Sequence, residues 1–234
     1  MKILAGTSGF SYKEWKGDFY PEKLPNNKML EFYAEKLPSV EINNTFYRVP
    51  KSNLLESWVK QVPADFRFAV KATRRITHIK RLKETSDETG YFLDTIQSLG
   101  KQLGAILFQL PPSLRKDSER LQSFLDLVPK GTPAAFEFRH ISWFDDDIYQ
   151  RLKAGNFALC IADTGDDAQT PLISTADWGY LRLRRVEYSK SQLKSWMKQI
   201  GSQGWDHAFV FFKHEDEATG PNLAAQFLQL AGQN

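Results

Sequence analysis

Acidic, basic and amide side chains recur at the ends of apolar segments in this sequence. The groups able to transfer protons or attack an electrophile are Glu41, Lys71, Glu137, His140 and Asp163. Carboxylates and imidazoles act as general acids and bases, and a lysine amine can also act as a nucleophile. The groups suited to binding a substrate are Asn43, Tyr47, Gln109, Arg139, Arg184, Lys213 and His214. Because cations are prominent in this set, we expect a small anionic or phosphorylated substrate.

Two glutamates, Glu41 and Glu137, are the leading candidates for acid/base chemistry. We expect them to face each other across one cavity. The glutamate nearer Lys71 or Arg139 would stay ionised, and the more buried one would be held protonated. On this hypothesis the chain is a metal-independent hydrolase, lyase or isomerase that uses no cofactor. Replacing Glu137 by glutamine would then cost little stability and would weaken ligand binding.

The acidic residues Glu41, Glu137 and Asp163 have three other interpretations. The first is a structural salt-bridge network, in which the acids neutralise Lys71 and arginines of the fifth and seventh strands. The second is a Schiff base on Lys71, whose pKa nearby arginines would lower. The third is a divalent metal site built from the acids and His140, which the interleaved cations disfavour.

Eight apolar, β-branched or aromatic segments of strand length alternate with segments of helical periodicity. The eight are Ile3–Ser8, Val40–Phe46, Phe66–Ala72, Ala105–Leu110, Ala134–His140, Phe157–Asp163, Tyr180–Arg184 and Ala208–His214. Alternation of strand and helix implies parallel strands with right-handed crossovers, and eight such strands can close on themselves. We therefore predict one α/β domain over residues 1–234, a (β/α)8 TIM-type barrel. Active sites of such barrels lie at the C-terminal ends of the strands, where the polar residues above fall.

Local signals place helices between these strands. Capping-box patterns, in which side chains satisfy free backbone N–H groups, occur at Thr85 with Glu88 and at Ser189 with Gln192. The connection over 164–179 is rich in Asp, Thr, Pro and Gly and has little helical periodicity. We therefore expect the helix after the sixth strand to be missing.

Composition limits the class of protein. Of the 234 residues, 41% are hydrophobic and 25% charged, which is typical of a globular domain and not of a disordered chain. Cys160 is the only cysteine, so no internal disulfide can form, in agreement with a reducing compartment. No apolar segment approaches the roughly 20 residues that cross a bilayer. We expect a cytoplasmic protein with no membrane partner.

A basic segment follows the third strand, and the formal net charge of the chain is +3. Its members are Lys71, Arg74, Arg75, His78, Lys80, Arg81 and Lys83. The alternative to an enzyme is therefore a non-catalytic protein that binds nucleic acid or another polyanion. Such a protein would lose affinity with rising salt and would tolerate the loss of Glu41 and Glu137.

Several motifs together resemble one family across essentially the whole chain. They are Gly6-Thr7-Ser8-Gly9-Phe10-Ser11-Tyr12, Val40-Glu41-Ile42-Asn43-Asn44-Thr45-Phe46-Tyr47, Phe66-Arg67-Phe68-Ala69-Val70-Lys71-Ala72, Leu107-Phe108-Gln109-Leu110-Pro111-Pro112-Ser113 and Phe136-Glu137-Phe138-Arg139-His140. The sequence resembles the YecE-like proteins, known as domain of unknown function 72. This resemblance implies an α/β barrel and no particular reaction. Many members carry asparagines where this chain has Lys213-His214, so binding through asparagine is not carried over to that position.

Overall fold

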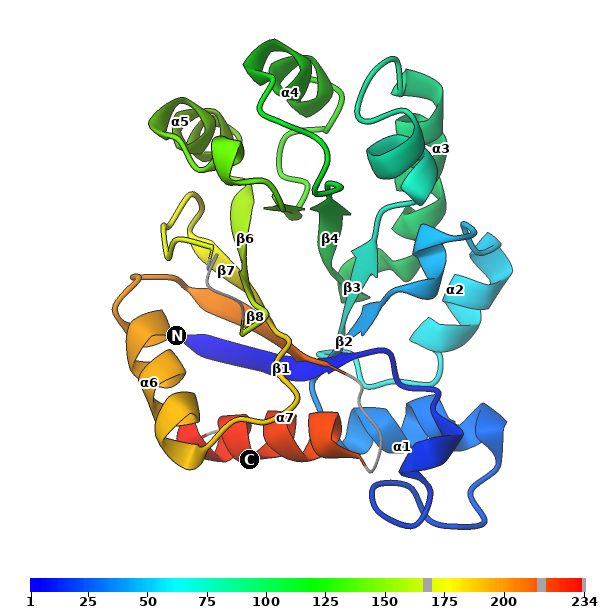
Figure 1. Ribbon diagram of the computed structural model, residues 1–234. Helices are drawn as coiled ribbons and strands as arrows, with labels where there is room; N and C mark the ends of the chain where they lie inside the picture. The colour runs from blue at the N-terminus through cyan, green and yellow to red at the C-terminus, as the bar shows by residue number, and fades with distance from the viewer. Residues whose placement is uncertain (166–169, 214–217, 233–234) are drawn as a thin grey trace.

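Eight parallel strands close into a barrel in the order in which they occur along the chain (Figure 1). The computed structural model describes residues 1–165, 170–213 and 218–232. The strands are β1 Lys2–Ser8, β2 Ser39–Ile42, β3 Arg67–Lys71, β4 Leu103–Gln109, β5 Ala134–Glu137, β6 Ala158–Asp163, β7 Trp178–Leu183 and β8 His207–Phe212. β8 pairs with β1 over six positions, which closes the barrel. The predicted (β/α)8 TIM-type barrel is confirmed.

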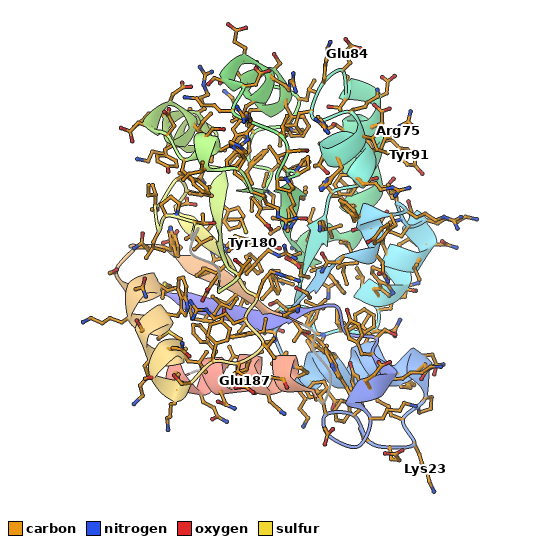
Figure 2. The ribbon with its side chains drawn as sticks, in the orientation of Figure 1. Lys23, Arg75, Glu84, Tyr91, Tyr180 and Glu187 are labelled. Atoms are coloured by element: carbon orange, nitrogen blue, oxygen red, sulfur yellow. The ribbon has the colours of Figure 1, made fainter. Side chains whose placement is uncertain are left out.

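Side chains alternate between the inner and outer faces of these strands. A compact apolar cluster fills the inside of the barrel and includes Leu4, Ala69, Leu107, Cys160, Tyr180 and Phe209. Figure 2 shows Tyr180 in the middle of the barrel, whereas Lys23 and Glu84 lie on the periphery. Intervening residues such as Val40, Phe68 and Phe108 belong to the larger outer core under the helices. Each strand therefore presents alternate residues to the barrel interior.

Two strands, β2 and β5, end three or more residues before the predicted position. β2 ends at Ile42 because Asn44–Phe46 forms a 3-10 turn, η3. β5 ends at Glu137, shortly before a second such turn, η6 (Ile141–Trp143). The buried Trp143 indole holds η6 in place by donating a hydrogen bond to the Leu114 carbonyl at 2.7 Å. β5 therefore ends at the site residue Glu137, and β2 ends between the site residues Glu41 and Asn43.

Helices surround the barrel (Figure 1). Those formed by the described residues are α1 Met29–Lys36, α2 Ser52–Val59, α3 Ser86–Ile96, α4 Ser118–Leu125, α5 Asp146–Ala154, α6 Lys190–Gly201 and α7 Thr219–Leu230. Between β6 and β7, residues 164–165 and 170–177 contain no helix, as predicted for this part of the connection. Within the described ranges, no helix is both long enough and apolar enough to cross a membrane.

The two predicted capping boxes have different outcomes. Ser189 caps α6, and the reciprocal bond from its backbone N–H to the Gln192 side chain is also present, so this prediction is confirmed. The box at Thr85 is wrong, because its hydroxyl makes no cap bond at the start of α3. Glu88 instead forms ion pairs with Arg75 and Lys80, both at 2.8 Å. These pairs tie the basic segment after β3 to α3.

Candidate functional site

A cavity of about 410 Å³ opens at the C-terminal end of the barrel, and we call it the mouth pocket. Its lining residues are Ser8, Tyr12, Asn43, Phe46, Tyr47, Lys71, His78, Gln109, Arg139, Arg182 and Arg184. They come from the ends of β1 to β5 and β7, or from the loops that follow. Four are lysine or arginine, and none of the described lining residues is acidic. The pocket is therefore lined by cations.

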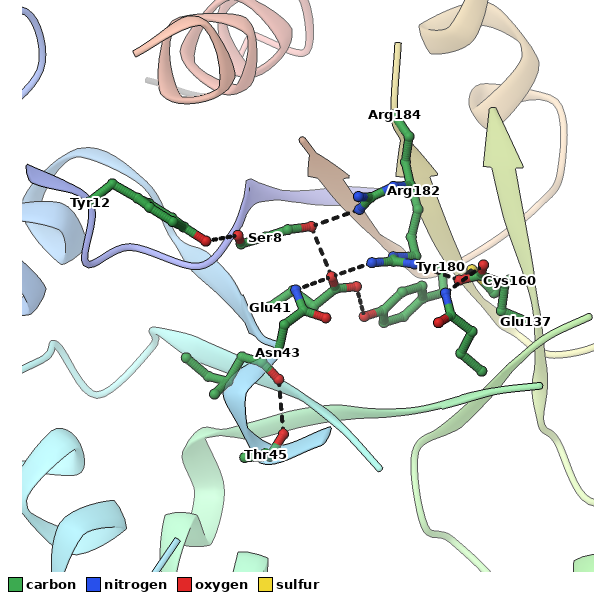
Figure 3. A network of polar contacts seen from close by, with 12 residues as sticks. Ser8, Tyr12, Glu41, Asn43, Thr45, Glu137, Cys160, Tyr180, Arg182 and Arg184 are labelled. Carbon is green, nitrogen blue, oxygen red and sulfur yellow. Dashed lines mark hydrogen bonds and ion pairs between the residues drawn. The ribbon is translucent and has the colours of Figure 1, made fainter. Parts of the chain in front are cut away.

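The floor of the mouth pocket contains a buried charge triad, formed by Glu41, Arg182 and Glu137 (Figure 3). Arg182 Nη2 lies 3.0 Å from Glu41 Oε1, and Arg182 Nη1 lies 2.7 Å from Glu137 Oε2. Each of the three side chains is 5% exposed or less. Charges buried to this extent are stable only when they are paired and hydrogen-bonded. One guanidinium therefore joins carboxylates from opposite sides of the barrel.

Further donors satisfy the remaining lone pairs of Glu41. Ser8 Oγ donates to Oε1 at 2.8 Å, Asn43 Nδ2 donates to the same oxygen at 2.9 Å, and the Tyr180 hydroxyl donates to Oε2 at 2.7 Å. For Glu137, the Gln109 amide donates to Oε1 at 2.7 Å. Asn43 and Gln109 thus contribute to the mouth pocket partly by orienting these carboxylates.

The environment of the triad keeps both carboxylates ionised. Burial raises the pKa of Glu41, but Arg182, the Tyr180 hydrogen bond and Arg184 outweigh it and lower the pKa from 4.5 to about 2. Burial also opposes ionisation of Glu137, and Arg182 again prevails, so its pKa is lowered. The expectation that one of the two is held protonated is wrong. Neither can act as a general acid at neutral pH.

Arg182 is the site residue that the sequence analysis did not single out. On β7 the inward positions are Tyr180 and Arg182, while Leu181 and Leu183 pack in the outer core. Arg184 continues the inward series above Arg182 and lies half-buried, with Nη1 3.4 Å from Ser8 Oγ. The sequence Arg182-Leu183-Arg184 could have indicated this position, because alternate residues of a strand share a face and the two arginines therefore point the same way. The salt-bridge interpretation did include an arginine of this strand.

Lys71 lies in the mouth pocket without a carboxylate partner. Its Nζ is 4.4 Å from the Phe46 ring centroid, and among the described residues no acidic oxygen lies within 4 Å of it. Burial and the nearby Arg182 lower the pKa of Lys71 from 10.5 to about 8. His78 packs on the same ring, with centroids 4.8 Å apart. Burial, Lys71 and Arg139 lower the pKa of His78, which favours its neutral imidazole.

The structure does not bring every predicted site residue into the pocket. Tyr47 lines the pocket only at its rim, where it is 71% exposed and the Arg74 guanidinium lies 6.0 Å from its ring. His140 instead caps η6, where its Nδ1 accepts from the Ser142 backbone N–H at 3.1 Å. Lys213 follows β8 and is half-buried but does not line the mouth pocket. His214 lies outside the described residues.

Asp163 is a correction to the predicted site, because it points away from the barrel interior. It follows Leu159 and Ile161 on the outer face of β6. Its carboxylate accepts from Arg185 Nε at 2.7 Å and from the Trp196 indole of α6 at 3.2 Å. β6 begins on the inner face at Ala158 and so ends on the outer one, whereas β5 begins on the outer face at Ala134 and ends at Glu137 on the inner one. Asp163 therefore anchors α6 and the loop before it.

We expect Asp163→Asn to lower the free energy of unfolding by about 2 kcal/mol. The asparagine NH2 group cannot accept a hydrogen bond, and it would replace a carboxylate oxygen that accepts from the surrounding donors. Hydrogen bonds to a charged group contribute about 1.5–3 kcal/mol each. Urea denaturation measures the change. Asp126→Asn, at the exposed end of α4, is the matched control and should change stability by less than about 0.5 kcal/mol. Equal effects of the two changes would contradict the anchoring role.

The candidate metal ligands do not converge. Glu41 and Glu137 are engaged by Arg182, Asp163 lies outside the barrel, and His140 caps a turn. In the part of the chain that the structure describes, no three His, Cys, Asp or Glu side chains are grouped so that they could hold a metal ion. These residues do not fit the metal-site interpretation.

A wider hollow of about 540 Å³ lies at the other end of the barrel, beside α1 and α7. Its charged lining residues are Lys2, Glu35, Lys36 and Asp65, so the two signs are balanced. A site in a barrel of this kind is expected at the C-terminal end of the strands. The mouth pocket has both that location and a concentration of polar groups on several strands.

Fold and site together define a class of protein: a TIM barrel with a cationic mouth above a buried carboxylate–arginine triad. The chain belongs to the family described as "Protein of unknown function DUF72", whose model matches residues 4–234. It is 25% identical over 230 residues to UPF0759 protein YunF of Bacillus subtilis, covering 92% of this chain and 79% of YunF. UPF0759 protein YecE of Escherichia coli is 33% identical over 116 residues, 49% of this chain and 43% of YecE.

A solved relative confirms the architecture. The crystal structure of a DUF72 family protein from Thermotoga maritima matches with a TM-score of 0.88 and 27% sequence identity, over 100% of both chains. The family resemblance and the barrel fold predicted from the sequence are thus confirmed. The names of these relatives state no substrate.

Proposed function

We propose that this barrel is an enzyme of the hydrolase, lyase or isomerase type that binds a small anionic or phosphorylated substrate in the mouth pocket. The observation that carries the proposal is the charge distribution. Lys71, Arg139, Arg182 and Arg184 line the pocket, and the described lining includes no acid. The triad carries two negative charges and one positive charge below the pocket. Lys71, Arg139 and Arg184 add three positive charges, so the site as a whole has a net positive charge. An anion would restore the balance.

The proposal assigns proton transfer to Lys71 and not to the carboxylates. Glu41 and Glu137 are poor bases, since the cation and hydrogen bonds that lower their pKa values also occupy their oxygens. An efficient acid/base group has a pKa near the working pH. Lys71, with a pKa of about 8, meets that condition and lines the pocket.

The alternative, binding of nucleic acid or another polyanion, has weaker support. It depended on the basic segment after β3 forming an exposed cationic strip. Arg75 and Lys80 are instead paired with Glu88, and Lys71 turns into the mouth pocket. The cations of the pocket lining converge on one cavity of about 410 Å³, which suits a small anion better than a long polyanion.

Inorganic phosphate is the simplest probe of the proposal. We expect it to bind the purified protein by calorimetry at fixed ionic strength, with Arg139→Gln and Arg184→Gln each weakening binding about tenfold. This corresponds to the loss of one charge-assisted hydrogen bond, worth about 1.4 kcal/mol. The matched control is Arg120→Gln on α4, whose arginine pairs with Asp117.

Two results would contradict the proposal. One is no measurable phosphate binding by the unsubstituted protein. The other is an equal loss of affinity in Arg120→Gln and in the two mouth variants, which would indicate general attraction to a basic surface.

A further inference from the structure

Lys71 has the position of a nucleophile, and among the described residues it forms no ion pair; its side chain packs on the Phe46 ring. It ends β3 on the inner register, and Thr45 Oγ1 fixes its backbone by donating to its carbonyl at 2.6 Å. Its side chain is partly exposed and lines the mouth pocket beside the Phe46 ring. A lysine that served only to neutralise the triad would be expected to touch a carboxylate. Arg182 holds both of them instead.

The surroundings of Lys71 favour its neutral amine. Burial removes water from the ammonium and is the largest cause of the lowered pKa; Arg182 adds to it, and Glu41 and Glu137 oppose it. With a pKa of about 8, about a tenth of the amine is neutral at pH 7, whereas an ordinary lysine is almost wholly protonated. Desolvation beside other cations is an established way to activate a lysine for attack on a carbonyl.

We propose that Lys71 forms an imine with a small carbonyl compound that carries a carboxylate or phosphate group. The inference deepens the proposed function and rests on it, because Arg139 and Arg184 must bind the anionic group. Both arginines line the same pocket as the amine, so one small molecule can present its anion to a guanidinium and its carbonyl carbon to Nζ. The pocket of about 410 Å³ suits a compound of a few carbon atoms.

The reaction balances without an oxidant or reductant. The ammonium first loses its proton to water, and the nitrogen lone pair attacks the carbonyl carbon. The carbonyl oxygen becomes the hydroxyl of a carbinolamine after proton transfer. That hydroxyl takes up one more proton and leaves as water, giving a protonated imine. The sum is one ammonium and one carbonyl converted to one protonated imine and one water, because the proton released at the start equals the one taken up at the end.

Borohydride trapping tests this step on the whole protein. Sodium cyanoborohydride adds hydride to the imine carbon and leaves a stable secondary amine, which mass spectrometry locates after digestion. Pyruvate and glyceraldehyde 3-phosphate, used separately, distinguish a carboxylate-bearing from a phosphate-bearing substrate. We expect Lys71 to be labelled at least about tenfold faster than the exposed Lys190, with roughly a fivefold rise from pH 7 to pH 8 that follows its pKa.

The variants separate this inference from the proposed function. Lys71→Arg keeps the positive charge and should lose the label, while Lys190→Arg should keep it; excess phosphate should protect Lys71. If phosphate binds at the mouth but neither probe labels Lys71 faster than Lys190, the imine is refuted and the proposed function stands. If phosphate does not bind either, both fail. Labelling of Lys71 that phosphate does not reduce would also overturn the inference, because the anion is required to position the carbonyl.

Discussion

Replacing Arg182 by methionine is expected to lower the free energy of unfolding by about 3–5 kcal/mol. The change leaves Glu41 and Glu137 ionised, buried and without their cation, and removal of one partner from a buried ion pair has costs of this size. A loss this large is a substantial part of the roughly 5–15 kcal/mol that stabilises a typical domain. Urea denaturation of the purified variant measures it, and a weak yield of folded protein would point the same way.

A compensated variant keeps this prediction testable if Arg182→Met does not fold. Changing Glu41 and Glu137 to glutamine together with Arg182→Met removes all three charges at once. Replacement of a whole buried ion network by neutral groups is often close to neutral for stability. We expect the triple variant to recover most of the loss. If it is as unstable as Arg182→Met, packing of the arginine side chain and not its charge is what matters.

The dependence on pH gives a second readout. Glu41 has a pKa of about 2 in the folded protein and 4.5 as its ordinary value, so its contribution to stability is fully present above about pH 4.5 and is lost as the pH falls toward 2. In Arg182→Met the cation is gone and burial remains, so the pKa of each carboxylate rises. The deficit of the variant should therefore be greatest at neutral pH and should shrink as the solution becomes acidic.

The sequence predicted the barrel because its signals are local and repeated. Each strand segment is recognisable from its own apolar residues, and alternation with helices fixes parallel pairing. The Ser189 capping box is equally local and was confirmed. The Thr85 box failed because Glu88 found stronger partners in Arg75 and Lys80, on the preceding loop. A prediction from a local pattern fails when a charged residue from another segment binds the same side chain.

The site depended on information that the sequence does not carry locally. Glu41 and Arg182 are 141 positions apart, and only closure of the barrel brings them together. Whether the last residue of a strand points inward or outward depends on the face on which the strand begins. A shift of one residue in the strand register is therefore enough to separate the inward Glu137 from the outward Asp163. Residue types at strand ends therefore identified the mouth. Which cation would pair with which carboxylate required the three-dimensional register.

The triad also changes what Glu137 is expected to do. In the catalytic hypothesis from the sequence, Glu137→Gln costs little stability and weakens ligand binding. The structure supports the reverse on both counts. The side chain is buried against Arg182, and glutamine would keep the hydrogen-bonding shape but remove one of the two charges that neutralise the guanidinium. We expect a loss of about 3 kcal/mol in the free energy of unfolding.

Binding of phosphate should become tighter in the same variant. Removing a negative charge below the mouth pocket makes the site more cationic, and a charge several ångströms away contributes on the order of 1 kcal/mol, or about fivefold in Kd. The pKa of Lys71 should fall below about 8, because Glu137 is one of the groups that raise it. NMR of lysine-labelled protein measures this shift.

Glu187→Gln is the matched control for Glu137→Gln, since it makes the same chemical change at an exposed position in the loop before α6. It should leave stability within about 0.5 kcal/mol and phosphate affinity nearly unchanged. Lower stability together with tighter binding in Glu137→Gln, and neither in the control, identifies Glu137 as a counter-ion that restrains the charge of the mouth. Unchanged stability with weaker binding would restore Glu137 as a carboxylate that acts on the ligand, and the assignment of proton transfer to Lys71 would then have to be withdrawn.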